Sequence, residues 1–177
     1  MTTKKPTTTT RATPTKSVMT KLKSDVTEKV QLTESSFVHE IFHEVSSETT
    51  ISKKIEILQK FDVNYIKSIL IWNFDSSIIS SLPEGDVPIE PKENPEIKPS
   101  SSIKKEWDKF YNFVKGGNDS MNNLRKEIMF INILETLHPL EAEILILVKD
   151  KKLQTKYNIT KEIISTAYPD IQWGNRI

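Results

Sequence analysis

The chain has 177 residues, a formal net charge of +1 at pH 7 and no cysteine. The lack of cysteine excludes disulfides, thiolate metal sites and a cysteine nucleophile. The near-neutral charge excludes both a polyanion and a uniformly basic protein. No apolar run approaches the ~20 residues that cross a bilayer, and no apolar signal-peptide core follows Met1. We therefore expect no membrane partner, and the length predicts one domain with appendages.

Residues 1–33 form a segment rich in threonine, lysine and proline that we expect to be disordered. Its first 24 residues contain six basic side chains and no acidic one. Apolar side chains are too few to offset the entropy cost of ordering. Such a tail can contact phosphate or an acidic surface, although a solubilising spacer is the simpler interpretation. The rest of the chain is acidic overall, which also suits self-association or a partner surface.

Residues 34–177 are predicted to form a single all-α domain, a compact bundle of about six or seven short helices. Apolar side chains recur at three- and four-residue intervals in the first three predicted helices, 37–47, 51–60 and 63–72. In the second of these, we expect Ile51 to point inward and Lys54 outward. A short helical turn is predicted at 78–82, followed by a sharp stop.

A proline-rich connector is predicted at 86–101, between the two helical halves of the domain. Its four prolines recur at about every fourth position, which excludes a helix or a central strand. We expect an extended, polyproline-like segment. Such a segment can be a ligand for aromatic grooves, but a plain linker is the favoured interpretation.

The stretch from Trp107 to Pro139 is predicted to hold the two central helices. One apolar face is expected to comprise Trp107, Phe110, Tyr111 and Val114. Gly116 and Gly117 can close that helix in the left-handed conformation, and Asn118, Asp119 or Ser120 can cap the next one. The inward residues predicted for this longer helix are Met121, Leu124, Ile128, Ile131, Leu134 and Leu137. Its predicted solvent-facing residues are Arg125, Lys126, Glu127 and Glu135.

The C-terminal part is predicted to contain two more helices. Residues 140–148 are nearly all apolar and suit a buried helix or a buried strand, with the preceding proline favouring the helix. A charged turn follows, and Thr160 is expected to cap a last helix over 161–168. Ile171 and Trp173 are expected to fold back onto the core.

Basic residues around the start of this last helix form the candidate nucleic-acid interface. They are Lys149, Lys151, Lys152, Lys156 and Lys161. Free N–H groups and the helix dipole favour an anion such as backbone phosphate at such a position. An ordinary charged turn is the alternative interpretation.

His39, Glu40 and His43 match the H-E-x-x-H pattern of zinc hydrolases. However, the third histidine, His138, lies about a hundred residues away, and no glycine-rich continuation follows His43. We expect surface or half-buried histidines and no metal. Phosphate-binding glycine loops and a G-x-S-x-G nucleophile elbow are absent from the sequence. We therefore predict a non-catalytic protein with no cofactor and no small-molecule substrate.

Several segments resemble a family of small uncharacterised proteins of large contractile-tailed phages, including phages of marine hosts. They are ISKKIEILQKFDVNYIKSIL, LPEGDVP, WDKFYNFVKGG, LHPLEAEILILVKDKKL and ITKEIISTAYPDI. The resemblance covers residues 37–174, and the family has no assigned activity. It implies a location in the host cytoplasm during infection or in the virion.

The same order of segments is also similar to the all-helical N-terminal DNA-binding domain of phage-type ATP-dependent DNA ligases. The residues that carry this similarity are Lys54 to Leu58, Leu124, Arg125, Ile128, Met129, Ala167, Pro169 and Ile171. The similarity implies that the basic turn before the last helix approaches DNA backbone. The nucleotide-accepting K-x-D-G motif and the adenylation domain are absent, so this chain alone cannot ligate DNA.

Two hypotheses about function follow. One is a non-catalytic protein that binds the backbone of duplex DNA in phage replication, recombination or repair, which the basic turn favours. The other is a structural or assembly-associated virion protein, whose basic tail and proline linker dock onto a phage protein assembly. The near-neutral net charge favours the second hypothesis.

Overall fold

The computed structural model describes residues 32–89 and 98–174, and within them the fold is all-α, as predicted. The elements are α1 (Val38–Ser47), α2 (Ile51–Lys60), α3 (Asn64–Phe74), α4 (Ile103–Glu106), the 3-10 helix η1 (Trp107–Phe113), α5 (Asn123–Thr136), α6 (Pro139–Lys149), α7 (Leu153–Lys156) and α8 (Lys161–Ala167). The predicted tail up to residue 31 and residues 90–97 of the connector lie outside the described residues.

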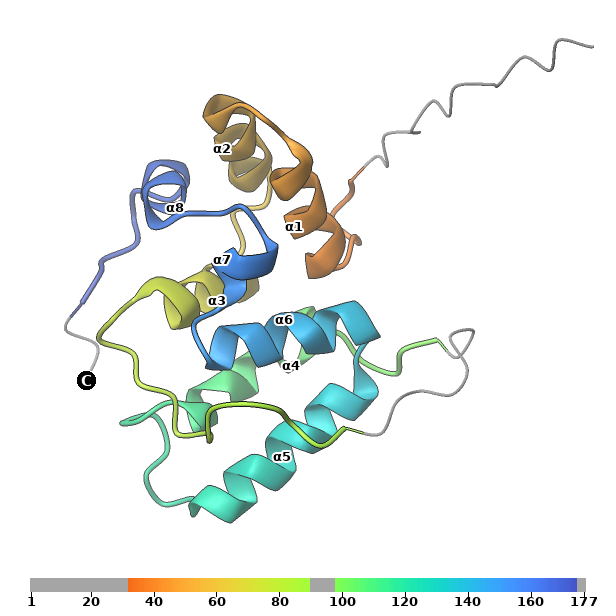
Figure 1. The fold of residues 1–177 in the computed structure, drawn as a ribbon, viewed down its shortest axis with the longest axis vertical. Helices are drawn as coiled ribbons and strands as arrows, with labels where there is room; N and C mark the ends of the chain where they lie inside the picture. Colours follow the sequence, from red (N-terminus) through yellow and green to blue (C-terminus); the bar gives the residue numbers. More distant parts are fainter. Residues whose placement is uncertain (1–31, 90–97, 175–177) are drawn as a thin grey trace, which may run out of the picture. The chain divides into compact units, whose positions relative to one another are not determined.

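Helix α6 lies at the centre of the bundle (Figure 1) and packs against α1, α3, α5 and α7. Its side chains Ile144, Leu145 and Val148 are fully buried. A helix that is apolar on most of its circumference is stable only when neighbours cover it on several sides. The helical prediction for this segment is therefore confirmed, with Pro139 at the first position.

Helix α2 has the predicted bounds, but the prediction for two of its side chains was wrong. Ile51 is 63% exposed, whereas Lys54 is only 3% exposed. The ammonium group of Lys54 donates to the carbonyl oxygen of Asn158 at 2.7 Å, so it joins α2 to the loop that precedes α8. On the same side, the Tyr168 hydroxyl donates to the carbonyl oxygen of Leu58 at 2.7 Å. Contacts with α8 therefore set the buried face of α2.

Helix α5 buries only part of the face predicted, because Leu134 and Leu137 are buried as expected while the first half of the stripe is not. Leu124 and Ile128 are 66% and 50% exposed, and Lys126 is buried. The apolar side chains that it buries are Phe130, Ile133 and Leu134. The sequence offers two apolar stripes at helical spacing, and packing selects one because the Phe130 ring meets Phe113 edge-on at 5.2 Å. The cap is Asn122, whose side chain accepts from Arg125 N.

The predicted helical turn at 78–82 is instead an extended segment. Ser80 forms an isolated antiparallel bridge with Val114. Ser81 N donates to the Phe113 oxygen at 2.7 Å, and Lys115 N donates to the Ile79 oxygen at 2.8 Å. These bonds hold the end of η1 against the segment that follows α3.

A buried carboxylate joins three segments that are distant in the sequence. Glu141 Oε1 accepts from Val38 N, and Oε2 accepts from Ile103 N, both at 3.0 Å. These N–H groups belong to the first residues of α1 and α4, where the helix itself supplies no acceptor. Burial raises the pKa of the Glu141 carboxyl above its ordinary range, and the two N–H donors oppose the shift.

Replacing Glu141 with glutamine tests this double cap. The amide offers one acceptor oxygen, so its NH₂ group faces the second N–H donor and leaves that donor unsatisfied. We expect Glu141→Gln to lower the free energy of unfolding by about 1–3 kcal/mol in chemical denaturation. The control is Glu143→Gln, which removes only a partly exposed ion pair with Lys156 and should cost no more than about 1 kcal/mol. Equal effects of the two variants would contradict a capping role.

Candidate nucleic-acid interface

Two of the five predicted interface lysines point into the protein. Lys149 is buried, and its ammonium group donates to the carbonyl oxygens of Pro83 and Gly85 at 2.9 and 2.7 Å and to Asp150 Oδ1 at 2.6 Å. Lys151 donates to the carbonyl oxygen of Asp75, and burial lowers the pKa of this lysine. Neither ammonium group is available to a ligand, because each one donates hydrogen bonds to backbone carbonyl oxygens of the protein.

The other three lysines lie at the surface with partners of their own. Lys152 pairs with Glu84 at 3.2 Å, and Lys156 pairs with Glu143. The Lys161 ammonium lies 4.7 Å from the centre of the Trp173 ring. Ion pairs between exposed side chains contribute only ~0–1 kcal/mol, so phosphate can replace the glutamates. Lys152 and Lys156 are therefore the residues of this turn that remain available to DNA.

A second group of cations was not predicted. The exposed side chains of Lys105, Lys115 and Arg125 form no ion pair with any residue that the structure describes. Arg125 and Lys109 line a hollow of about 550 Å³ between η1 and α5. For Lys105 and Lys115, the run KKEWDKFYNFVK contains a signal, since its lysines are interspersed with aromatic residues.

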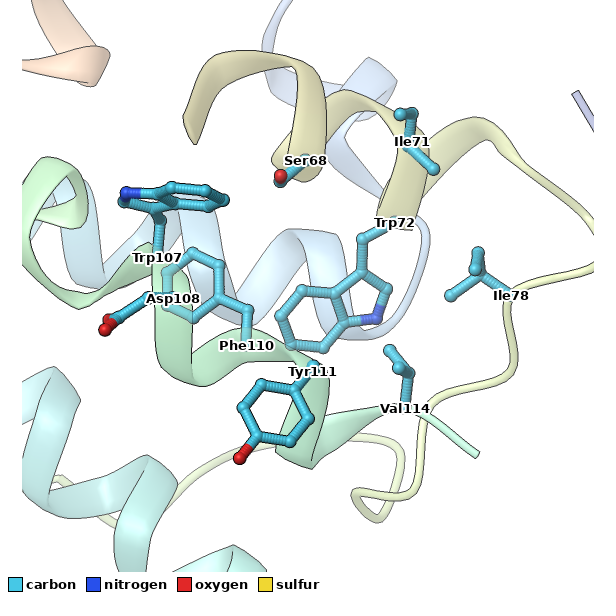
Figure 2. Close-up of a pocket in the computed structure, with 9 residues that line it drawn as sticks. All are labelled: Ser68, Ile71, Trp72, Ile78, Trp107, Asp108, Phe110, Tyr111 and Val114. Carbon is cyan, nitrogen blue, oxygen red and sulfur yellow. The ribbon is translucent and has the colours of Figure 1, made fainter. Parts of the chain in front are cut away.

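An aromatic groove of about 300 Å³ lies between α3 and η1. Trp72 of α3 and Trp107, Phe110 and Tyr111 of η1 line it, and Figure 2 shows the Tyr111 ring pointing away from α3. The rings of Trp72 and Phe110 are 5.9 Å apart. Ser68 and Asp108 are its polar lining residues. The Trp72 indole nitrogen is buried, faces Ile78 and Val114, and has no acceptor among the described residues.

The 3-10 geometry of η1 leaves Tyr111 exposed. With three residues per turn, Trp107, Phe110 and Phe113 align on one side, where Phe110 and Phe113 are buried. Tyr111 lies on the next side and is 55% exposed. The prediction of an α-helical face that includes Tyr111 was therefore wrong.

The glycine pair Gly116 and Gly117 forms the turn that follows η1. Gly116 has a φ of +78°, which confirms the predicted left-handed turn. A Cβ atom at Gly117 would lie 1.8 Å from the Tyr111 carbonyl oxygen, so only glycine fits without a shift of the backbone. The Asn118 amide then donates to Asn112 Oδ1 at 2.7 Å and holds the turn against η1.

The residues of the H-E-x-x-H match take other roles. Glu40 accepts from Phe37 N at 2.8 Å and so caps α1. His39 stacks on His138 with ring centres 4.4 Å apart, and His138 Nδ1 accepts from Leu140 N. Within 32–89 and 98–174, no three His, Cys, Asp or Glu side chains gather where they could hold a metal ion.

The fold and these surfaces define a small all-α protein with an aromatic groove and with exposed cations that form no ion pair among the described residues. Residues 41–155 match the family described as "Family of unknown function (DUF6433)", and the chain belongs to this family. No curated protein and no solved structure matches the chain. Among the described residues, no helix has the length and apolar character needed to cross a membrane.

The stacked histidines predict a dependence of stability on pH. Burial, and then the neighbouring His138, lower the pKa of His39, while Glu40 opposes the shift. The unfolded chain then binds the proton more readily, so stability should fall as the pH drops below ~6.5 towards the lowered pKa. His39→Phe keeps the ring stack and should give a shallower loss of stability between about pH 7 and 5. An unchanged slope would contradict the role of His39, and His43→Phe at an exposed position is the control.

Proposed function

We propose that this protein is a non-catalytic accessory factor that binds the phosphate backbone of DNA. The observation that carries the proposal is the exposure of Lys105, Lys115 and Arg125 without an acidic partner among the described residues. Unpaired exposed cations bind phosphate by releasing counterions from DNA, and they lose no internal ion pair in doing so. The other two candidate cations, Lys152 and Lys156, must first break their ion pairs with Glu84 and Glu143 before they can contact phosphate.

The distribution of charge supports the same proposal. Residues 103–117 contain four lysines and two acidic residues, whereas the part of the chain from residue 32 onward is acidic overall. A local basic strip on an acidic body attracts DNA to one place and repels it from the remainder. The binding that we expect is therefore oriented rather than uniform over the surface.

The sequence resemblances agree with this class of ligand. The similarity to the DNA-binding domain of phage-type ligases supports backbone binding, and the similarity to phage proteins supports a role in phage replication, recombination or repair. The host cytoplasm during infection is the matching location. In this proposal, Lys152 and Lys156 on the turn supply a second phosphate contact.

Binding of labelled duplex DNA, nicked and intact, at several salt concentrations tests the proposal. Lys105→Glu combined with Lys115→Glu should weaken binding. It should also reduce the slope of log K against log salt by about 0.9 for each lost phosphate contact. The matched control is Lys53→Glu with Lys60→Glu on α2, where both lysines already pair with glutamates. Lys152→Glu with Lys156→Glu measures the contribution of the turn.

Two outcomes would contradict backbone binding by the folded domain. One is the absence of binding at low salt. The other is binding that disappears only when residues 1–31 are removed, which would make the basic N-terminal segment a nonspecific arm.

A second candidate function is supported by the exposed stripe of α5. Leu124 and Ile128 lie one turn apart and are the most exposed large apolar residues of this helix. The adjoining hollow includes Met121 and Met129. Exposed apolar patches of this kind mark protein interaction sites, so we propose a structural or assembly-associated virion protein as the alternative.

Mass spectrometry of purified virions tests this alternative. Stoichiometric recovery of the chain would support it, and loss of incorporation in Leu124→Glu with Ile128→Glu would assign the contact to α5. Glu127→Gln on the same helix is the control. Absence from virions would contradict the assembly role.

A further inference from the structure

We propose that the exposed face of α5 pairs with the same face of a second copy of this chain, in an antiparallel two-fold arrangement. This face consists of Leu124, Arg125, Ile128, Asn132 and Glu135. The inference goes beyond the DNA-binding proposal, and it names a partner for the apolar stripe that the second candidate function uses. A two-fold interface brings one surface against itself, so that surface must be self-complementary.

Much of this face is apolar and uncovered. Leu124 and Ile128 lie one turn apart and are 66% and 50% exposed, and Ile131, one turn further along, is half-buried. The hollow of about 550 Å³ between η1 and α5 adjoins them and extends along the helix from Met121 to Thr136. Packed helices have their axes ~8–10 Å apart. A second helix that lies along α5 therefore covers the stripe and the hollow together.

The two ends of the face carry opposite charges. Arg125 lies in the first turn of α5 and Glu135 in the last, and both side chains are exposed. Neither forms an ion pair with a residue that the structure describes. The other charged residues that line the hollow, Glu106 and Lys109, pair with each other at 2.6 Å. Arg125 is therefore the charge in the hollow that an occupant has to match with a carboxylate.

An antiparallel pair centred on the level of Phe130 matches these charges. Arg125 and Glu135 each lie five residues from that level, so Arg125 of one copy lies level with Glu135 of the other copy, twice by symmetry. Ile128 lies two residues from the same level, so the two Ile128 residues of the pair are ~6 Å apart along the helix axis. The arrangement thus places an apolar centre between two ion pairs.

Charge reversal in the full-length chain tests this register. In sedimentation equilibrium at ~100 µM, the wild-type protein should have twice the mass of one chain. Arg125→Glu and Glu135→Arg each bring like charges together, and each should raise the dissociation constant of the dimer at least about tenfold. An equal mixture of these two variants should form a heterodimer as tight as the wild-type dimer, because opposite charges again meet at both levels. Lys60→Glu on α2 makes the same change of charge as Arg125→Glu and is the matched control.

The two reversals should leave the fold intact. Both positions are exposed, and the helix dipole favours an acidic side chain in the first turn and a basic one in the last. Circular dichroism checks that each variant keeps the helical content of the wild-type protein. The recovery in the mixture is a second check, because an unfolded chain would not pair.

Three outcomes would overturn the inference. They are a wild-type chain that stays monomeric up to ~100 µM, a dimer whose dissociation constant neither reversal changes, and a mixture of the two variants that does not pair. A monomeric wild-type chain would leave the α5 face to a different protein. DNA binding through Lys105 and Lys115 is measured separately. A monomer that binds duplex DNA would overturn the pairing alone, and a dimer that binds no DNA would overturn the DNA-binding proposal alone.

Discussion

The two oxygens of the Glu141 carboxylate hold the starts of α1 and α4 on the central helix α6. These helices lie on opposite sides of the connector in the sequence, so one side chain links the two halves of the fold. The 3-10 helix η1 follows α4 without a break. The position of η1, which lines one side of the aromatic groove, therefore depends on the hydrogen bond that Ile103 N donates to Glu141 at the start of α4. Leaving either N–H unsatisfied in the interior would cost ~1–3 kcal/mol.

The lysines of this protein have two different roles, since some bond to the backbone of the fold and others are exposed at the surface. Lys54, Lys149 and Lys151 donate to backbone carbonyl oxygens of loops. Burial of an ammonium group is tolerated there because the carbonyl oxygens replace water. The positive charges that remain for a partner are a smaller and differently placed set. A count of lysines in a turn therefore overstates its surface potential.

The two candidate functions use adjacent surfaces. Lys105, Lys115 and the η1 side of the aromatic groove belong to α4, η1 and the turn after it, while Leu124, Arg125 and Ile128 belong to α5. Lys109 and Arg125 line the hollow between these regions. A DNA strand and a protein partner would therefore compete for, or share, one side of the η1–α5 pair. Backbone phosphate requires the cations, whereas a protein surface requires the apolar stripe.

The sequence by itself determined the all-α class, most helix bounds and the glycine turn after η1, because helical periodicity, prolines and positive-φ positions are local properties of the chain. It also determined that most of residues 140–148 would be buried, although Leu140 is exposed. Tertiary structure decided which part of the apolar surface of α5 is covered, since α6 and η1 pack on the side that includes Phe130 and leave Leu124 and Ile128 exposed. It decided that η1 is a 3-10 helix with Tyr111 exposed, and that Lys149 and Lys151 face inward. Those outcomes depend on partners far away in the sequence, such as Pro83 and Asp75, which local spacing cannot reveal.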